Sequence, residues 1–413
     1  MIPFAIIGFG GGVTPVPYAI KKLTKAGNDE GQLWALMTNG DLYVAGSAAC
    51  TGLGKDGSGN NIQPDGWTLT NTGVIDVYPA QSRGAMVKKG PGQYEFCYAG
   101  AGGPWQWPVV DASLQNSWNP MPASAMTVDG KNVYDEAVKV EGIYLVQADG
   151  SVYQMRSETP TLAFPEKVKD IYARGTGPSV RVDLDGTIKY TGINGNAAVV
   201  STSAAQNTNY TWATVGTPGV VYERAKAVNG QIRDPNSAGA LQVAAIVAQT
   251  ADGKWWGSGS LSMLGASSSD SAGPSLQPLD SIPVGCELYV SQMVSQYIPG
   301  INWRRGLQSF IVDKQAGIYK SAGTQGGAYS LFRNLATSSS STVYTDVDQA
   351  ILDDGGIDYV VEGFGDQFTA LVTNGGHIFW CGRGYTGTQW PVPFRVASAY
   401  NGRLDDEKLL PPE

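Results

Sequence analysis

The feature that most constrains the fold is a motif that returns seven times along the chain. Each copy has a short apolar stretch, a turn centred on glycine, and a second stretch that carries an aromatic residue and often ends in glycine. The copies begin at Ala35, Ala85, Tyr144, Val180, Ala245, Phe310 and Ala370. Such self-similarity is typical of a repeat architecture in which one supersecondary unit is reused.

Each copy predicts two strands joined by a tight turn, because Asn-Gly and Asp-Gly readily supply the positive φ that two-residue hairpin turns require. Five copies carry such a dipeptide: Asn39-Gly40, Asp149-Gly150, Asp185-Gly186, Asp252-Gly253 and Asn374-Gly375. The other two differ. Gly90-Pro91-Gly92 predicts a longer loop, and Ala316-Gly317 predicts a shifted turn.

The segments between the turns are long enough for two more strands per unit. Valine-rich or alternating stretches fill them, beginning at Val74, Ala137, Lys167 and Ile357. A unit of about four antiparallel strands, repeated radially, is a propeller blade. The sequence therefore predicts an all-β fold, a seven-bladed β-propeller of four-stranded antiparallel blades.

Two stretches add a family resemblance. The segment IDYVVEGFGDQFTALVTNGGHIFWCGRGYTG from Ile357 resembles the repeat of the regulator of chromosome condensation family, and the segment from Ile20 follows the same order. In that repeat a valine strand and glycine precede an apolar strand, an Asp/Asn-Gly turn, an aromatic-glycine strand and a glycine-rich loop. The resemblance covers most of residues 18–400, is weakest between about 95 and 140, and implies seven blades.

The two ends of the chain fit a closed ring. The segment from Pro391 resembles the opening strand of a family repeat, and the strands from Ile20 would complete that repeat. We therefore expect one blade to form by pairing N- and C-terminal segments, which would remove free sheet edges. The expected organisation is an N-terminal docking peptide (1–17), the propeller (18–400) with a loop insertion at about 100–125, and an acidic/polar tail (401–413).

Charge argues against nucleic acid as a partner. The net charge is −8, and the basic residues are scattered in pairs such as Lys21-Lys22, Lys88-Lys89 and Arg304-Arg305. Nucleic-acid binders usually carry a basic stripe, because neutralising phosphates supplies much of their affinity. The founding family member works on chromatin and a small GTPase, and neither role is carried over to this chain.

The residues that usually carry catalysis or bind cofactors are few. The four cysteines, Cys50, Cys97, Cys286 and Cys381, have neither zinc nor redox spacing, and His377 is the only histidine. We expect a structural or exposed position for His377, and no metal or cofactor.

Paired carboxylates leave room for glycoside hydrolysis. The candidates are Asp183 with Asp185, Asp346 with Asp348, Asp353 with Asp354, and Asp313. Most lie beside expected turns, where aspartate is favoured for local backbone hydrogen bonds. The prediction is that the protein is not an enzyme, with a carbohydrate-cleaving propeller as one alternative.

Three tryptophans lie in or beside the expected loop insertion: Trp105, Trp107 and Trp118. Loop aromatics can stack on sugar rings or anchor a protein partner, and they can also only pack the loop against the blade. Carbohydrate recognition at a host surface through these residues is the second functional alternative.

The first seventeen residues carry no charged side chain. They match a signal peptide poorly, and they are too short for a membrane span. An apolar peptide beside a glycine run suits docking in a partner's groove or adding a strand to its sheet. We expect the contacts to come from Ile2, Pro3, Phe4, Ile6, Ile7 and Phe9. Packing on the chain's own propeller and a signal sequence are the alternatives.

Together these features predict a non-enzymatic structural or binding propeller. The glycine-, serine-, threonine- and asparagine-rich β-structure with few charges resembles, in style, bacteriophage virion accessory proteins such as tail, collar or capsid decorations. The expected partners are other virion or assembly proteins, reached through the N-terminal peptide, with a host surface glycan as a further partner. The expected location is the virion, and the alternative is a soluble cytoplasmic or secreted protein.

Overall fold

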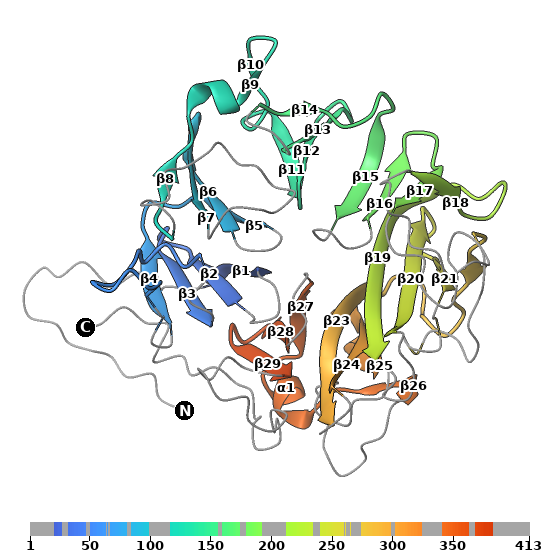
Figure 1. Ribbon diagram of the computed structural model, residues 1–413. Helices are drawn as coiled ribbons and strands as arrows, with labels where there is room; N and C mark the ends of the chain where they lie inside the picture. Colours follow the sequence, from blue (N-terminus) through green and yellow to red (C-terminus); the bar gives the residue numbers. More distant parts are fainter. Residues whose placement is uncertain are drawn as a thin grey trace, which may run out of the picture.

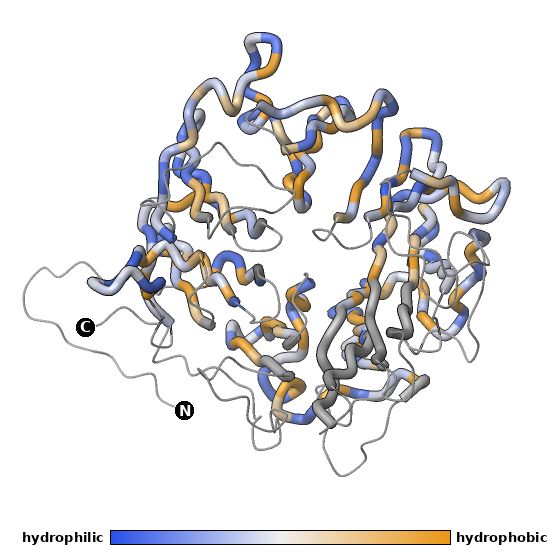
Figure 2. The backbone as a smooth tube through the Cα atoms, viewed as in Figure 1, coloured by the Kyte–Doolittle hydropathy of each residue, from blue (hydrophilic) through white to orange (hydrophobic). Residues whose placement is uncertain are grey.

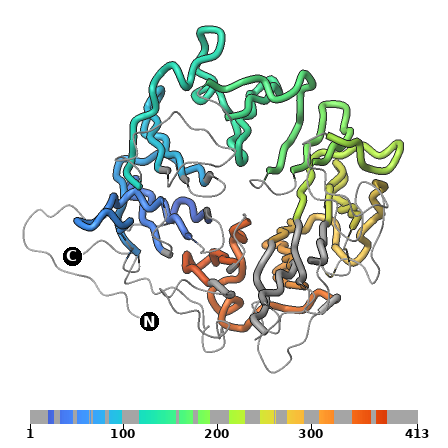
Figure 3. The backbone as a smooth tube through the Cα atoms, viewed as in Figure 1, coloured from blue at the N-terminus to red at the C-terminus, as the bar shows by residue number. Residues whose placement is uncertain are grey.

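The computed structural model describes residues 20–26, 32–46, 50–62, 64, 67–80, 84–98, 116–155, 159–173, 179–191, 212–233, 240–259, 261, 265, 274–298, 302–323, 341–362 and 368–382. These residues form a ring of seven β-sheet blades that follow one another in chain order, as Figures 1 and 3 show by colour. The prediction of an all-β, seven-bladed propeller is confirmed.

The first four blades are four-stranded antiparallel sheets. Blade 1 contains β1 (Ile20–Ala26), β2 (Gln32–Met37), β3 (Leu42–Gly46) and β4 (Thr68–Asn71). Blade 2 contains β5 (Asp76–Ala80), β6 (Gly84–Gly90), β7 (Gln93–Tyr98) and β8 (Asn119–Pro120). Blade 3 contains β11 (Ala137–Glu141), β12 (Tyr144–Gln147), β13 (Val152–Gln154) and β14 (Thr161–Leu162). Blade 4 contains β15 (Val168–Ala173), β16 (Ser179–Asp183), β17 (Ile188–Thr191) and β18 (Ala213–Val215).

The remaining blades are less uniform. Blade 5 contains β19 (Tyr222–Arg233), β20 (Ala240–Thr250), β21 (Trp255–Gly259) and β22 (Gln277–Pro278). Blade 6 contains β23 (Glu287–Ile298), β24 (Asn302–Asp313), β25 (Ile318–Gly323) and β26 (Ser341–Asp346). Blade 7 has three strands among the described residues: β27 (Ile357–Val361), β28 (Phe368–Thr373) and β29 (Ile378–Gly382).

Short elements connect some of the blades. Between blades 2 and 3 lie a 3-10 turn (Ala123–Ala125) and a small hairpin of β9 (Thr127–Val128) and β10 (Lys131–Asn132). The helix α1 (Gln349–Asp353) precedes blade 7, and the carboxylate of Asp348 caps it by accepting from the N–H of Ala350. The expected insertion thus contains β8, which completes blade 2, and its residues 100–115 lie outside the described part of the chain.

The repeated turns are hairpins, but their geometry differs from the two-residue type that we predicted. In blade 1 the N–H of Met37 donates to the carbonyl of Asp41, so the loop has three residues and ends in Gly40 with a φ of 89°. Asn39 stabilises it, because its side-chain oxygen accepts from the N–H of Asp41. This is a turn followed by a left-handed glycine, which also suits the twist of the strands. Asp149, Asp185 and Asp252 repeat this hydrogen bond in their own loops.

The Gly90-Pro91-Gly92 turn is tighter than predicted. Gly90 pairs directly with Gln93, so that only Pro91 and Gly92 form the turn. Proline is favoured at the first central position of a β-turn, and Gly92 supplies a φ of 65° at the second. The longer loop that we expected there is therefore wrong.

The turn glycines also approach the next blade closely. The carbonyl of Gly150 accepts from the N–H of Val168, which opens blade 4, at 2.9 Å, and Gly40 makes the same bond to Val74 of the segment leading into blade 2. A Cβ on Gly150 would lie 2.7 Å from the carbonyl oxygen of Val168. Glycine is thus required here both by its positive φ and by the space available.

Apolar side chains are buried where neighbouring blades face one another, and Figure 2 shows hydrophobic residues along the strands of the blades. Trp34 and Leu36 of blade 1 pack with Val77 and Val87 of blade 2, for example. The ring also closes by packing, because Leu33 and Met37 of blade 1 share a cluster with residues of blade 7.

A hydrogen bond supports this closure. The N–H of Leu23 in β1 donates to the hydroxyl of Tyr359 in β27 at 2.9 Å. Burial raises the pKa of Tyr359 to about 12. The expected pairing of N- and C-terminal strands involves the segment from Pro391, which lies outside the described residues and so stays a prediction.

Blades 5 and 6 carry much longer inner hairpins than the others. Their strands β19, β20, β23 and β24 have 11 or 12 residues, whereas β15 and β16 of blade 4 have 6 and 5. At about 3.3 Å per residue, the long strands span about 40 Å. Ile232 of β19 pairs with Arg304 of β24, which joins the two blades into one eight-stranded sheet. We call β19–β20 with β23–β24 the paired hairpins (Figure 1).

Candidate functional site

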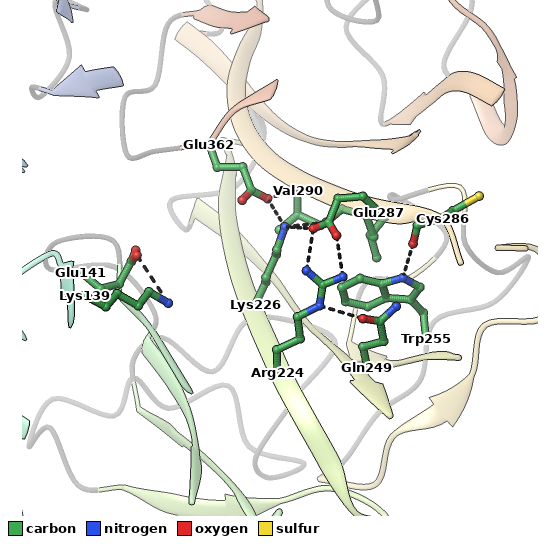
Figure 4. Close-up of polar contacts among 11 residues, drawn as sticks. Lys139, Glu141, Arg224, Lys226, Gln249, Trp255, Cys286, Glu287, Val290 and Glu362 are labelled. Atoms are coloured by element: carbon green, nitrogen blue, oxygen red, sulfur yellow. Dashed lines mark hydrogen bonds and ion pairs between the residues drawn. The ribbon is translucent and has the colours of Figure 1, made fainter. Parts of the chain in front are cut away.

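The candidate site lies at the base of the paired hairpins, where blades 5, 6 and 7 meet. Arg224 and Lys226 stand two residues apart in β19, so they share one face of the sheet. Glu287 opens β23, and Glu362 directly follows β27. We call these four residues the junction cluster, and Figure 4 shows them converging.

Lys226 is the centre of the junction cluster. Its Nζ lies 3.1 Å from Oε1 of Glu287 and 3.1 Å from Oε1 of Glu362, and it donates to the carbonyl of Leu288 at 2.6 Å. The side chain is only 11% exposed, and it also lies over the ring of Tyr289. Since Glu362 Oε1 further accepts from the N–H of Val290, one lysine connects three blades.

Arg224 completes the cluster on the side of blade 5. Its two terminal nitrogens contact the two oxygens of Glu287 at 3.0 and 2.5 Å, a bidentate pair, and its Nε donates to Gln249. The guanidinium lies 5.0 Å from the ring centre of Trp255, which is fully buried and donates to the carbonyl of Cys286. Burial is the main cause that raises the pKa of the Cys286 thiol.

The contact between Lys226 and blade 6 has counterparts elsewhere in the ring. Lys22 of blade 1 contacts the carboxylate of Asp76 and donates to the carbonyl of Val77 in blade 2. Lys139 of blade 3 does the same with Asp170 and Ile171 of blade 4. We call this arrangement, a lysine on one inner strand that binds an acid and the next carbonyl on the following inner strand, the lysine clamp.

A second polar network lies among blades 1, 6 and 7. Lys25 of β1 is 3% exposed and its Nζ lies 3.4 Å from the hydroxyl of Ser291 in β23. Ser291 contacts Thr369 of β28 at 3.2 Å, and Thr369 accepts from the amide of Gln308. Buried polar groups that bond to one another fix a unique arrangement, since leaving them unpaired is costly.

These contacts indicate what the candidate site can do. In the junction cluster two cations face two carboxylates, so the charges balance. Lys226 and Glu362 are nearly buried, whereas Arg224 and Glu287 are partly exposed, and charges that are paired in this way leave little net field to attract an ion. The junction cluster therefore connects the base of the paired hairpins to blade 7.

Most of the site residues predicted from the sequence lie outside the described residues. This holds for Trp105 and Trp107 and for the N-terminal set of Ile2, Pro3, Phe4, Ile6, Ile7 and Phe9. Trp118 is described: its indole donates to the hydroxyl of Thr70 at 3.0 Å and meets Trp34 edge to face at 5.6 Å. These contacts are those of a packing residue, and ligand binding by Trp118 stays a prediction.

His377 has a structural setting that the sequence did not reveal. Its Nδ1 lies 2.7 and 2.8 Å from the two carboxylate oxygens of Asp354, which also accepts from the hydroxyl of Thr373. A Cβ on Gly375 would lie 2.5 Å from the same carboxylate. The histidine thus belongs to the hydrogen-bond network that holds the last hairpin turn. The two partners lie 23 positions apart in the sequence, so the pair could not be predicted, and the only signal was a lone histidine beside a turn.

The other carboxylate candidates also have local partners. Asp313 accepts from the N–H groups of Gln315 and Ala316, and Asp185 from that of Thr187, as expected of turn residues. Asp183 instead lies 3.1 Å from the buried Arg181 and 3.2 Å from Lys189. Within the described part of the chain, no group of three or more His, Cys, Asp or Glu residues could hold a metal ion.

Arg181 is the largest buried cation of blade 4. Its guanidinium lies 3.7 Å from the ring centre of Phe164 and contacts Glu166. The hydrogen bond from Lys189, together with Arg181, lowers the pKa of Glu166 to about 2.

Among the described residues, no helix is both long enough and apolar enough to span a membrane.

The fold and its contacts define a class of protein, the seven-bladed β-propeller. No family model matches the chain, and no curated protein does so either. A solved structure of Prp20p from Saccharomyces cerevisiae, described with its binding to Gsp1p and histones, matches with a TM-score of 0.54 at 15% identity, over 84% of this chain and 80% of that one.

Two further structures show weaker similarity. Yeast RCC1 (Prp20) bound to Kap60 has a TM-score of 0.42 at 12% identity, over 92% of this chain and 80% of that one. Human WBSCR16 has a TM-score of 0.40 at 12% identity, over 87% and 77%. The match to the Prp20p structure, at 15% identity, shows the fold alone.

Proposed function

We propose that this chain is a non-enzymatic binding scaffold of a larger assembly, a virion, which it joins through its N-terminal peptide. The observation that carries the scaffold role is the pair of long hairpins of blades 5 and 6. They join two blades into one sheet and stand on a base of paired charges. A rigid ring with an added sheet suits the presentation of a binding surface.

The virion context rests on the sequence. Glycine-rich β-structure with 15% charged residues suits a durable structural protein, and the uncharged residues Ile2–Phe9 suit docking in a partner's groove. The non-enzymatic part is supported by the local partners of the described carboxylate candidates and of His377.

The experiment is to delete residues 2–12 and to measure, by mass spectrometry, whether the protein is incorporated into the particles with which it co-purifies. We expect a folded propeller that no longer joins its assembly. Deletion of the tail, residues 401–413, is the matched control and should leave incorporation unchanged. Normal incorporation of the N-terminal deletion would contradict the proposal.

A further inference from the structure

Beyond the base, both outer edges of the paired hairpins lack a partner strand among the described residues: the edge of β20 at 240–244 and the edge of β23. β23 pairs with β24 from Glu287↔Val312 to Ile298↔Asn302, and no described strand pairs with its other edge. Natural sheets usually protect such an edge with charged residues or proline, because an open edge invites another chain to pair. The part of β23 beyond the junction cluster, Gln292–Ile298, contains neither.

This open edge already binds a carboxylate near its base. The N–H of Val290 points away from β24 and donates to Oε1 of Glu362 at 2.8 Å. Because successive N–H groups of a strand alternate between its two edges, those of Gln292 and Val294 face the same open edge. The edge therefore continues past Glu362 as a row of backbone donors.

Basic residues predominate in the strands of the paired hairpins beyond the base, and the sequence between β19 and β20 adds one acid, Asp234. The strand segments beyond the base are 229–233, 240–244, 292–298 and 302–307, and their charged residues are Arg233, Arg304 and Arg305, with no Asp or Glu. The whole chain, in contrast, has a net charge of −8. The register places Arg305 opposite Val294 and Arg304 opposite Gln296, in the strand directly beside the open edge.

We propose that the open edge of β23 binds an extended, acidic segment of a partner protein by strand addition. The inference deepens the proposed scaffold function and rests on it. Backbone hydrogen bonds to β23 would give affinity, and acidic side chains that alternate along the added strand would complement the arginines of the hairpins.

Two other occupants fit less well. A second copy would bring its own three arginines to the same place, where like charges repel. The N-terminal peptide of this chain has no charged side chain to match the arginines.

The test uses the full-length protein and a fluorescent peptide of about ten residues in which glutamate alternates with threonine and valine. Binding is measured by anisotropy, with the glutamine counterpart of the peptide as its control. We expect the acidic peptide to bind at least about tenfold more tightly than the glutamine peptide. Raising the salt from about 50 to about 500 mM should abolish most of this difference, because salt screens exposed charges.

Two sets of variants locate the site. Gln292→Pro removes one donor from the open edge and leaves the pairing edge intact, whereas Gln292→Ala keeps the donor, so only the proline variant should lose binding. The double variant Arg304→Gln with Arg305→Gln should bind about tenfold more weakly, and Lys131→Gln in β10 should not change binding. Thermal melting checks that each variant is folded.

Equal binding of the glutamate and glutamine peptides, or unchanged binding by a folded Gln292→Pro variant, would overturn the inference. A dimer that Gln292→Pro converts to a monomer, without peptide binding, would assign the edge to a second copy instead. These failures are distinct from a failure of the scaffold proposal, since incorporation of the N-terminal deletion is measured separately.

Discussion

Blades 3 and 4 and blades 5 and 6 are built from the same repeat, yet they are joined in different ways. Between blades 3 and 4 one lysine clamp, Lys139 with Asp170, lies in a partly exposed setting. Between blades 5 and 6 the clamp lysine is buried, contacts a third blade, and is accompanied by Arg224. The junction with the additional contacts coincides with the longer hairpins, so we expect the ring to be more stable where a sheet extends from it.

The largest expected effect comes from removing the centre of the junction cluster. Lys226→Met would leave Glu362, whose side chain is 11% exposed, without a cation, whereas Glu287 would keep its pair with Arg224; we expect a cost of about 3 kcal/mol in the free energy of unfolding. Guanidinium denaturation measures this change. A loss below about 1 kcal/mol would show that the junction is no stronger than the others.

The next effect tests the contact of the turn glycines with the following blade. Gly150→Ala combines a φ of 85° with a Cβ placed 2.7 Å from the carbonyl oxygen of Val168, so we expect a loss of about 2–3 kcal/mol. Gly253→Ala is the matched control in blade 5. It has a φ of 82°, but its nearest contact is 3.4 Å away, and it should cost only about 1 kcal/mol. Equal losses in the two variants would show that crowding plays no part.

A smaller effect is expected at the clamp of blades 3 and 4. The side chain of Lys139 is 37% exposed, so solvent screens its pair with Asp170. Lys139→Met should therefore lower the free energy of unfolding by about 0.5–1 kcal/mol, which is several times less than Lys226→Met. A comparable loss would remove the contrast between the two junctions.

The smallest effect is confined to acid pH and to blade 4. Lys189 and Arg181 lower the pKa of Glu166 to about 2, well below its ordinary value near 4.5. Since the folded pKa is the lower one, the stability that this carboxylate contributes is complete above about pH 4.5 and is lost as the pH falls towards about 2. Thermal melting between these values should show a weaker pH dependence for Glu166→Gln than for the wild type. Identical slopes would contradict the assignment.

Local features of the fold were predictable because their causes are local. Asn39 and Gly40 predict a hairpin, since a side-chain oxygen two residues from an N–H and a residue with positive φ act within one turn. The strands from Val74, Ala137 and Ile357 followed from alternation, and the repeat count gave seven blades. The errors in the predicted turns were also local. The loop at Gly40 has three residues and not two, and the turn at Pro91 is shorter than the predicted loop.

The candidate site could not be found in this way. Arg224 lies 63 residues from Glu287, and Lys226 lies 136 residues from Glu362. Nothing in the local sequence pairs them, because each lysine and each glutamate is by itself typical of a solvated strand. The lengths of β19 and β24 could not be predicted from the sequence either, because a mixed run of polar and apolar residues can continue a strand or follow its end.

The sequence by itself determined that this chain repeats one hairpin unit seven times, because turn chemistry and strand alternation are properties of neighbouring residues. Only the tertiary structure decided which blades are joined by buried charges and which hairpins merge into one sheet. Those choices depend on burial and on the register between distant strands, and these arise only when the ring brings the blades together.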